Sequence, residues 1–138
     1  MFGAAPETRG SIAAVVECYR AHGLFKRWPI EYLATHGEGG AARSGALALD
    51  ALRRFALVLA RHGRAPVHLH LSGRAAPRRD AAFMAAVLAA RSPLIVQLHG
   101  GGFEQGHGGR LEALLFEQAA CVIVACESVR AWVRSVAR

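Results

Sequence analysis

Apolar and polar positions follow two different periods along this chain. Short apolar runs with the composition of strands occupy residues 30–35, 67–71, 94–98 and 121–125. Other segments repeat apolar residues every three or four positions, as amphipathic helices do. These segments are residues 11–22, 44–61, 78–90, 110–118 and 128–136, the last with Ser128 as its expected N-cap. The pattern therefore predicts strands that alternate with helices.

This alternation favours a parallel sheet with helices on both faces. The runs LIVQL and CVIVA are almost wholly apolar, as strands covered on both sides are. Only ten residues precede the first helix, so we expect a clipped first strand that ends at Met1 and Phe2. We predict one α/β domain over residues 1–138, a Rossmann-like, doubly wound sheet of about five strands. With strand order 3-2-1-4-5, the ligand crevice would lie between the first and fourth strands.

Two glycine-containing loops would meet at that crevice. They are GAAPETRGS after the first strand and HGGGFEQGHGG after the fourth. The sequence His-Gly-Gly-Gly resembles the oxyanion-hole loop of lipases and esterases, but the chain has no Gly-x-Ser-x-Gly elbow for the nucleophile. An esterase is therefore a less favoured alternative.

Composition excludes some classes of protein. Hydrophobic residues make up 53% of the chain and charged residues 20%, so a globular domain is expected. The net charge is +7, but of 17 basic residues only Lys26 is a lysine, which indicates arginine bias. Aromatic residues do not interleave the arginines, and we expect no nucleic-acid partner. The three cysteines lack metal-ligand spacing, and a reduced, cytoplasmic chain fits best.

Three further motifs have weaker interpretations. GEGGAA matches a dinucleotide fingerprint but follows the second strand rather than the first. His68 and His70 share one face of a strand, yet no third ligand has suitable spacing, so we favour a core or crevice role and no metal. Arginines cluster just after the third strand, where Arg78 and Arg79 could hold an anionic acceptor.

Taken in order, a series of segments resembles the N-terminal half of bacterial family-4 glycosyltransferases of GT-B fold. The segments are TRGSIAAVV, GLFKRWPIEYLATHGEGG, HLHLSGRAAPRRDAAFM, LIVQLHGGGFEQ and ACVIVACESVRAWV. They cover almost the whole chain, and the series is more specific than any one motif. The resemblance implies the acceptor-side domain of a two-domain enzyme. It also implies that the C-terminal, donor-binding domain is missing here, so that the chain alone would not catalyse transfer.

The same resemblance implies a function and a set of site residues. The enzyme would move a sugar, with retention, from a nucleotide-sugar to a polysaccharide, glycolipid or related acceptor. It would need no cofactor or metal and would act in the cytoplasm, with peripheral contact at the inner face of the plasma membrane. The family's Gly-Gly-Ile turn corresponds to Gly10, Ser11 and Ile12, which places Gly10 and Ser11 at the donor phosphate. The family's catalytic-cleft histidine corresponds to His99, which is the expected catalytic residue. The other residues expected in the cleft loop or at the acceptor are Gly100, Gly101, Phe103, Ser72, Arg78 and Arg79.

Two positions depart from the family pattern. Ser11 replaces the second glycine of the turn, and Gly102 stands where relatives often have an acid. Two alternatives to the enzyme hypothesis remain: a non-catalytic binding domain, or an inactive fragment. The alternative role for His99 is to organise its loop without taking part in chemistry.

Overall fold

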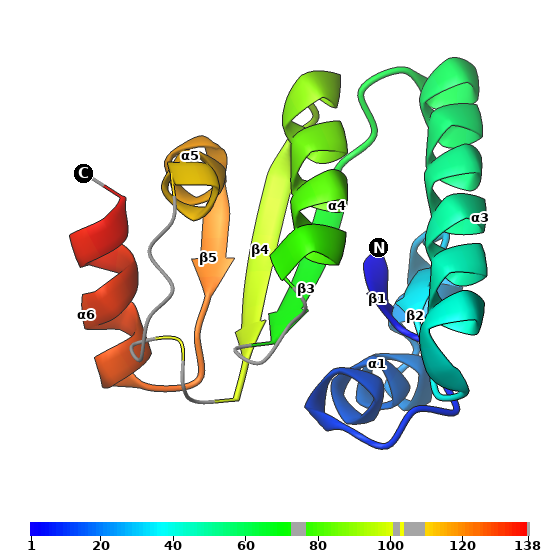
Figure 1. Ribbon diagram of the computed structural model, residues 1–138, viewed down its shortest axis with the longest axis horizontal. Coiled ribbons are helices and arrows are strands. Elements are labelled where there is room, and N and C mark those ends of the chain that lie inside the picture. The colour runs from blue at the N-terminus through cyan, green and yellow to red at the C-terminus, as the bar shows by residue number, and fades with distance from the viewer. Residues whose placement is uncertain (73–76, 101–102, 104–109, 138) are drawn as a thin grey trace.

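The computed structural model describes residues 1–72, 77–100, 103 and 110–137, without the side chains of 77–81 and 111. In this part of the chain, five parallel strands form one sheet in the order β2-β1-β3-β4-β5 (Figure 1). The strands are β1 (Phe2–Ala4), β2 (Leu33–His36), β3 (Val67–Ser72), β4 (Leu94–His99) and β5 (Cys121–Ile123). The helices are α1 (Ser11–Ala21), α2 (Leu24–Arg27), α3 (Gly40–His62), α4 (Pro77–Ala90), α5 (Arg110–Gln118) and α6 (Glu127–Val136).

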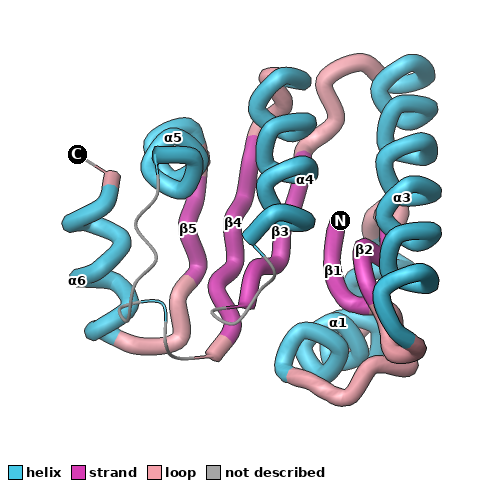
Figure 2. The backbone as a smooth tube through the Cα atoms, viewed as in Figure 1, coloured by secondary structure: helices cyan, strands magenta, loops and turns pink. Residues whose placement is uncertain are grey.

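Helices cover both faces of the sheet. Tyr19 of α1 lies against His68 and His70 of β3, whereas Phe55 of α3 packs on Phe2, which pairs in register with Leu69. Because successive strand residues point to opposite faces, α1 and α3 must lie on opposite sides. Figure 2 shows α4 between α3 and α5 along the sheet, with α1 packed separately near β1. These observations confirm the predicted Rossmann-like α/β sheet.

The predicted strand order is wrong. β3, and not the fourth strand, lies beside β1, and β2 forms the edge. Alternate residues of β2 are half-buried, which suits an edge strand. The 23-residue α3 then connects β2 at that edge to β3 on the other side of β1. The crossover direction therefore reverses between β1 and β3, and the ligand crevice of such a fold belongs there. The loops after β1 and β4 are separated by one strand.

Element boundaries differ from the predictions mainly at their ends. β2 begins three residues later than predicted, α3 begins four residues earlier, and the short α2 was not predicted. The N-cap of α6 is Cys126, so Ser128 lies inside the first turn rather than at the expected cap. GEGGAA forms the junction between β2 and α3, as its place after the second strand predicted. Gly39 and Gly40 adopt positive φ there, a conformation that favours glycine.

A cluster of aromatic side chains fills the core between the sheet and α3 and α4. The ring of Phe2 lies 5.0 Å from that of Phe55 and 5.4 Å from that of Phe83, centroid to centroid. Phe2 and Phe83 are almost completely buried. Since Phe2 belongs to β1, this cluster holds the short first strand in place.

We predict that Phe83→Ala lowers the free energy of unfolding by about 3–5 kcal/mol, because it leaves a cavity against Phe2. Leu49→Ala is the matched control on α3. Leu49 is 71% exposed, and its truncation should cost about 0.5 kcal/mol or less. Urea unfolding measures both variants. Equal losses of stability would contradict this location of the core.

Candidate functional site

Five polar side chains form a continuous stripe on the face of the sheet that α1 covers. His68 and His70 come from β3, Gln97 and His99 from β4, and Tyr19 from α1. The β3–β4 register pairs His70 with Gln97 and Ser72 with His99, so the strand residues of the stripe lie on one face. A polar stripe inside an apolar sheet is stable only when its groups are hydrogen-bonded.

Gln97 forms the hydrogen bonds in the part of the stripe that lies nearer the amino ends of the strands. The Tyr19 hydroxyl donates to Gln97 Oε1 at 2.9 Å, and His68 Nε2 lies 3.1 Å from the same oxygen. Because a carboxamide oxygen only accepts hydrogen bonds, Nε2 is the nitrogen of His68 that carries hydrogen. Gln97 thereby fixes the tautomer of His68 and attaches α1 to β4.

His70 and His99 form the half of the stripe nearer the carboxyl ends of the strands. His70 Nδ1 lies 2.8 Å from His99 Nε2, and the two rings stack with centroids 5.0 Å apart. Both residues are only 5% exposed. The other ring nitrogen of His70, Nε2, is buried and has no hydrogen-bond partner among the described residues. One imidazole nitrogen in this pair is therefore available to a water molecule or a ligand.

Burial keeps these rings neutral. Desolvation is the main cause that lowers the pKa of His68 to about 4 and that of His70 to about 3, and the neighbouring His68 and His99 rings contribute to the shift at His70. Hydrogen bonding to Gln97 opposes part of the shift at His68. Desolvation also lowers the pKa of His99. At neutral pH, each ring therefore offers one donor and one acceptor nitrogen and no positive charge.

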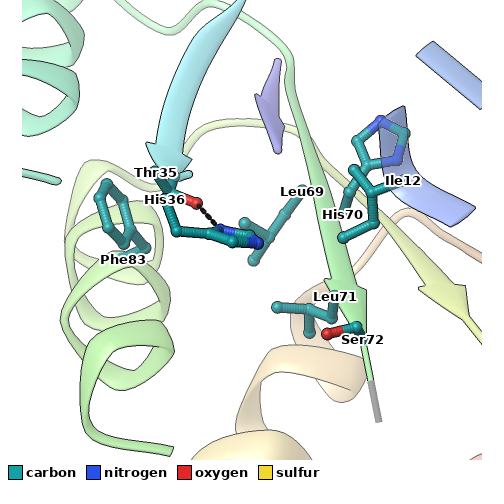
Figure 3. A pocket seen from close by; sticks show the side chains of 8 residues that line it. All are labelled: Ile12, Thr35, His36, Leu69, His70, Leu71, Ser72 and Phe83. Carbon is teal, nitrogen blue, oxygen red and sulfur yellow. Dashed lines mark hydrogen bonds between the residues drawn. The ribbon is translucent and has the colours of Figure 1, made fainter. Parts of the chain in front are cut away.

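The first turn of α1 lies near His70. Ile12 lines a small cavity of about 10 Å³ together with His70 and Ser72, at the crevice between β1 and β3 (Figure 3). A cavity of that size has room for about one water molecule. Gly10 is the N-cap of α1 and Ser11 its first residue, and both are exposed. Glycine has no side chain to cap the first-turn N–H groups, which leaves them to solvent or to an anion.

Some of the expected cleft residues lie at the carboxyl ends of the strands, and others do not. Gly100 follows β4 with φ +79°, a left-handed turn that favours glycine, and Ser72 ends β3 opposite His99. Phe103, expected in the cleft, is instead buried, with its ring 5.6 Å from that of Trp132. Packing in the core removes this apolar ring from water. Gly101 and the side chains of Arg78 and Arg79 lie outside the described residues.

Metal binding is not indicated by the described part of the chain, which holds no group of three or more His, Cys, Asp or Glu side chains placed to bind an ion. His68 and His70 stack on each other with centroids 4.3 Å apart. Within the same residues, no helix is long and apolar enough to cross a membrane.

The comparisons with known proteins give no relatives. No protein family model, no curated protein and no solved structure matches the chain. The site is therefore interpreted from its own chemistry.

Sequence reasoning missed two members of the stripe, Tyr19 and Gln97, and did not pair His70 with His99. A signal for Gln97 was available, because a lone polar residue inside the apolar run LIVQL must find a partner when buried. Tyr19 lies within the predicted helix 11–22 and counts as one of its apolar repeats, but its hydroxyl donates a hydrogen bond to Gln97.

The depressed histidine pKa values predict loss of stability in mild acid. The unfolded chain binds protons near the ordinary pKa of 6.5, whereas folded His68 and His70 resist protonation down to about 4 and 3. The stabilisation is therefore complete above pH 6.5 and is lost progressively as the pH falls towards 4. The urea midpoint, measured at about pH 7.5 and at about pH 5, reports this loss. Most carboxylates stay ionised between these two pH values, so they contribute little to the difference.

A matched pair of variants assigns the effect. His68→Gln keeps a polar side chain that cannot be protonated and should reduce the pH dependence. His62→Gln is the matched substitution at an exposed position on α3. Identical pH dependence in both variants would refute the assignment to His68.

Proposed function

We propose that this chain supplies the acceptor-side half of a retaining, nucleotide-sugar-dependent glycosyltransferase. The acceptor would be a polysaccharide, a glycolipid or a related carbohydrate. The observation that carries this proposal is the buried, neutral His70–His99 pair, in which His70 lines a cavity with Ile12 of the first turn of α1. It brings a donor and acceptor of hydrogen bonds next to a helix N-terminus, at the fold's ligand crevice.

Neutral imidazoles suit the recognition of sugar hydroxyls. A hydroxyl both donates and accepts, and a neutral histidine offers one nitrogen of each kind. The contact between His70 Nδ1 and His99 Nε2 fixes the orientation of the His99 ring, and Nε2 of His70 has no partner among the described residues. In the proposed reaction, an acceptor hydroxyl attacks the anomeric carbon of the donor sugar and the bond from that carbon to the diphosphate breaks. The hydroxyl proton passes to the departing nucleoside diphosphate. His99 would position donor and acceptor.

The first turn of α1 suits the departing diphosphate. Negative charge is stabilised by the free N–H groups and the positive dipole end of a helix N-terminus, by about 0.3–1 kcal/mol for an exposed site. Gly10 has an extended backbone with φ 172°, which any residue adopts, and a Cβ at this position would meet no described atom within 4 Å. The glycine is therefore not required for packing, and the space beside it is open to a ligand. No cofactor takes part in this proposal, since the nucleotide-sugar is a substrate.

Binding of a nucleotide-sugar to the 138-residue chain tests the site. We expect uridine diphosphate-glucose, titrated to the order of 10 mM, to give saturable NMR shifts in the first turn of α1 and in the rings of His70 and His99. His99→Ala should weaken binding about tenfold because it removes the positioned imidazole. His22→Ala, at the exposed far end of α1, should leave the affinity unchanged. Equal affinity of the two variants would overturn the role of His99.

A substitution at Ser11 tests whether backbone N–H groups bind the diphosphate. Ser11 is the first residue of α1, where proline is tolerated, so Ser11→Pro deletes one N–H without breaking the helix. We expect Ser11→Pro to weaken binding of uridine diphosphate about tenfold, the effect of losing one hydrogen bond to a charged group. Ser11→Gly keeps the N–H and should bind at least as well as the unaltered chain.

The outcomes of these titrations separate the alternatives. If the Ser11→Pro variant binds uridine diphosphate as well as the unaltered chain does, the α1 N-terminus is not the phosphate site. Binding of oligosaccharides without any nucleotide-sugar would support the non-catalytic binding domain instead.

A further inference from the structure

A negative charge lies next to the proposed phosphate site. The backbone N–H of Arg9 donates a hydrogen bond to Glu38 Oε1 at 3.3 Å. Arg9 directly precedes Gly10, the N-cap of α1, and consecutive Cα atoms are about 3.8 Å apart. The Glu38 carboxylate therefore lies about one residue's length from the turn at which the departing diphosphate would bind.

The GEGGAA motif holds Glu38 in this place, because the loop between β2 and α3 packs against the loop between β1 and α1 (Figure 1). The Ala5 N–H donates a hydrogen bond to the His36 carbonyl at 2.7 Å. Gly37 approaches Ala5 so closely that a Cβ at Gly37 would lie 3.2 Å from the Ala5 Cβ. Glu38 follows directly, so its backbone is fixed beside the residues that lead into α1.

The charge of Glu38 is not neutralised by a neighbour. Among the described residues, no basic side chain forms a salt bridge with it. Glu7, on the loop between β1 and α1, differs in this respect because Arg43 pairs with it at 2.7 Å. The hydrogen bond from Arg9 to Glu38 is longer than the usual distance of about 2.9 Å, and both residues are exposed. The carboxylate therefore acts on any anion that approaches the first turn of α1.

The donor and the product of the proposed reaction differ in charge at the phosphate that would bind this turn. In a nucleotide-sugar, the sugar esterifies the terminal phosphate, which then carries a single negative charge. In the released nucleoside diphosphate the same phosphate is free, and its second ionisation has a pKa of about 6. At neutral pH and above, this phosphate is therefore mostly doubly charged, and a nearby carboxylate repels it more strongly.

We propose that Glu38 is a specificity-determining residue that favours the nucleotide-sugar over the free nucleoside diphosphate at the first turn of α1. This inference rests on the proposed function, because it needs the diphosphate to bind there. Glu38 repels both ligands, but it repels the nucleoside diphosphate more, since that ligand carries the additional charge on the phosphate nearest Arg9. In the proposed enzyme, this difference would promote release of the product and limit its inhibition of further turnover.

A purely structural role for Glu38 would have a different effect on the two ligands. Glu38→Gln keeps the shape of the side chain and an oxygen that accepts the Arg9 N–H, and it removes only the charge. If Glu38 only anchored its loop, this substitution would change the affinities for both ligands by the same factor. If Glu38 acts through its charge, the ratio of the two affinities changes.

The test compares the dissociation constants of uridine diphosphate and uridine diphosphate-glucose, measured by NMR titration of the 138-residue chain at about pH 7.5 and low ionic strength. We expect Glu38→Gln to strengthen binding of uridine diphosphate about fivefold and binding of uridine diphosphate-glucose about twofold, because a repulsive charge is removed. At about 0.5 M sodium chloride both gains should become smaller, since salt screens charges at exposed positions.

Asp50→Asn is the matched control, because it removes the same charge from an exposed position on α3 that lies three turns beyond Glu38, roughly 15 Å along the helix. It should change neither affinity by more than about 1.5-fold. Equal gains for the two ligands in Glu38→Gln, or gains no larger than those of Asp50→Asn, would overturn this inference and leave the proposed function standing. If the unaltered chain binds neither ligand, or if Ser11→Pro binds uridine diphosphate as well as the unaltered chain does, the phosphate site fails and this inference fails with it.

Discussion

The hydrogen bond from Tyr19 to Gln97 connects segments that are 78 residues apart and sets the position of α1. It spans the face of β3 and attaches the helix to β4, although the chain places α1 directly after β1. Once this bond is made, the first turn of α1 must lie over the crevice between β1 and β3. Ile12 then contacts the cavity that His70 and Ser72 line. The geometry of the proposed site therefore depends on a polar contact inside an otherwise apolar layer.

Much of the fold could be predicted from sequence because its elements have distinct periods. The runs LIVQL and CVIVA indicated β4 and β5, although β5 ends two residues before the predicted limit. The strand order could not be derived in the same way. It depends on whether β2 or β3 occupies the edge, and the deciding feature is the half-buried alternation of Leu33–His36. In a segment of four residues, that alternation is too short to distinguish an edge strand from an interior one by composition.

The candidate site was predictable only in its parts. The position of His99 follows from an apolar strand that ends before a glycine loop, and Gly100 adopts the left-handed turn that such a loop requires. The partner of His99 could not be found without the register, since His70 lies 29 residues earlier on another strand. Phe103 illustrates the opposite case. The family resemblance implied a cleft residue at this position, but the ring of Phe103 is buried and lies 5.6 Å from that of Trp132.

β1 connects the core on one face of the sheet with the candidate site on the other. Its Phe2 packs on Phe55 and Phe83, and its carboxyl end leads to the first turn of α1. The neighbouring strand β3 pairs with β1 through Leu69 and carries His70 on the opposite face. The packing that holds β1 therefore also determines where the first turn of α1 lies relative to His70.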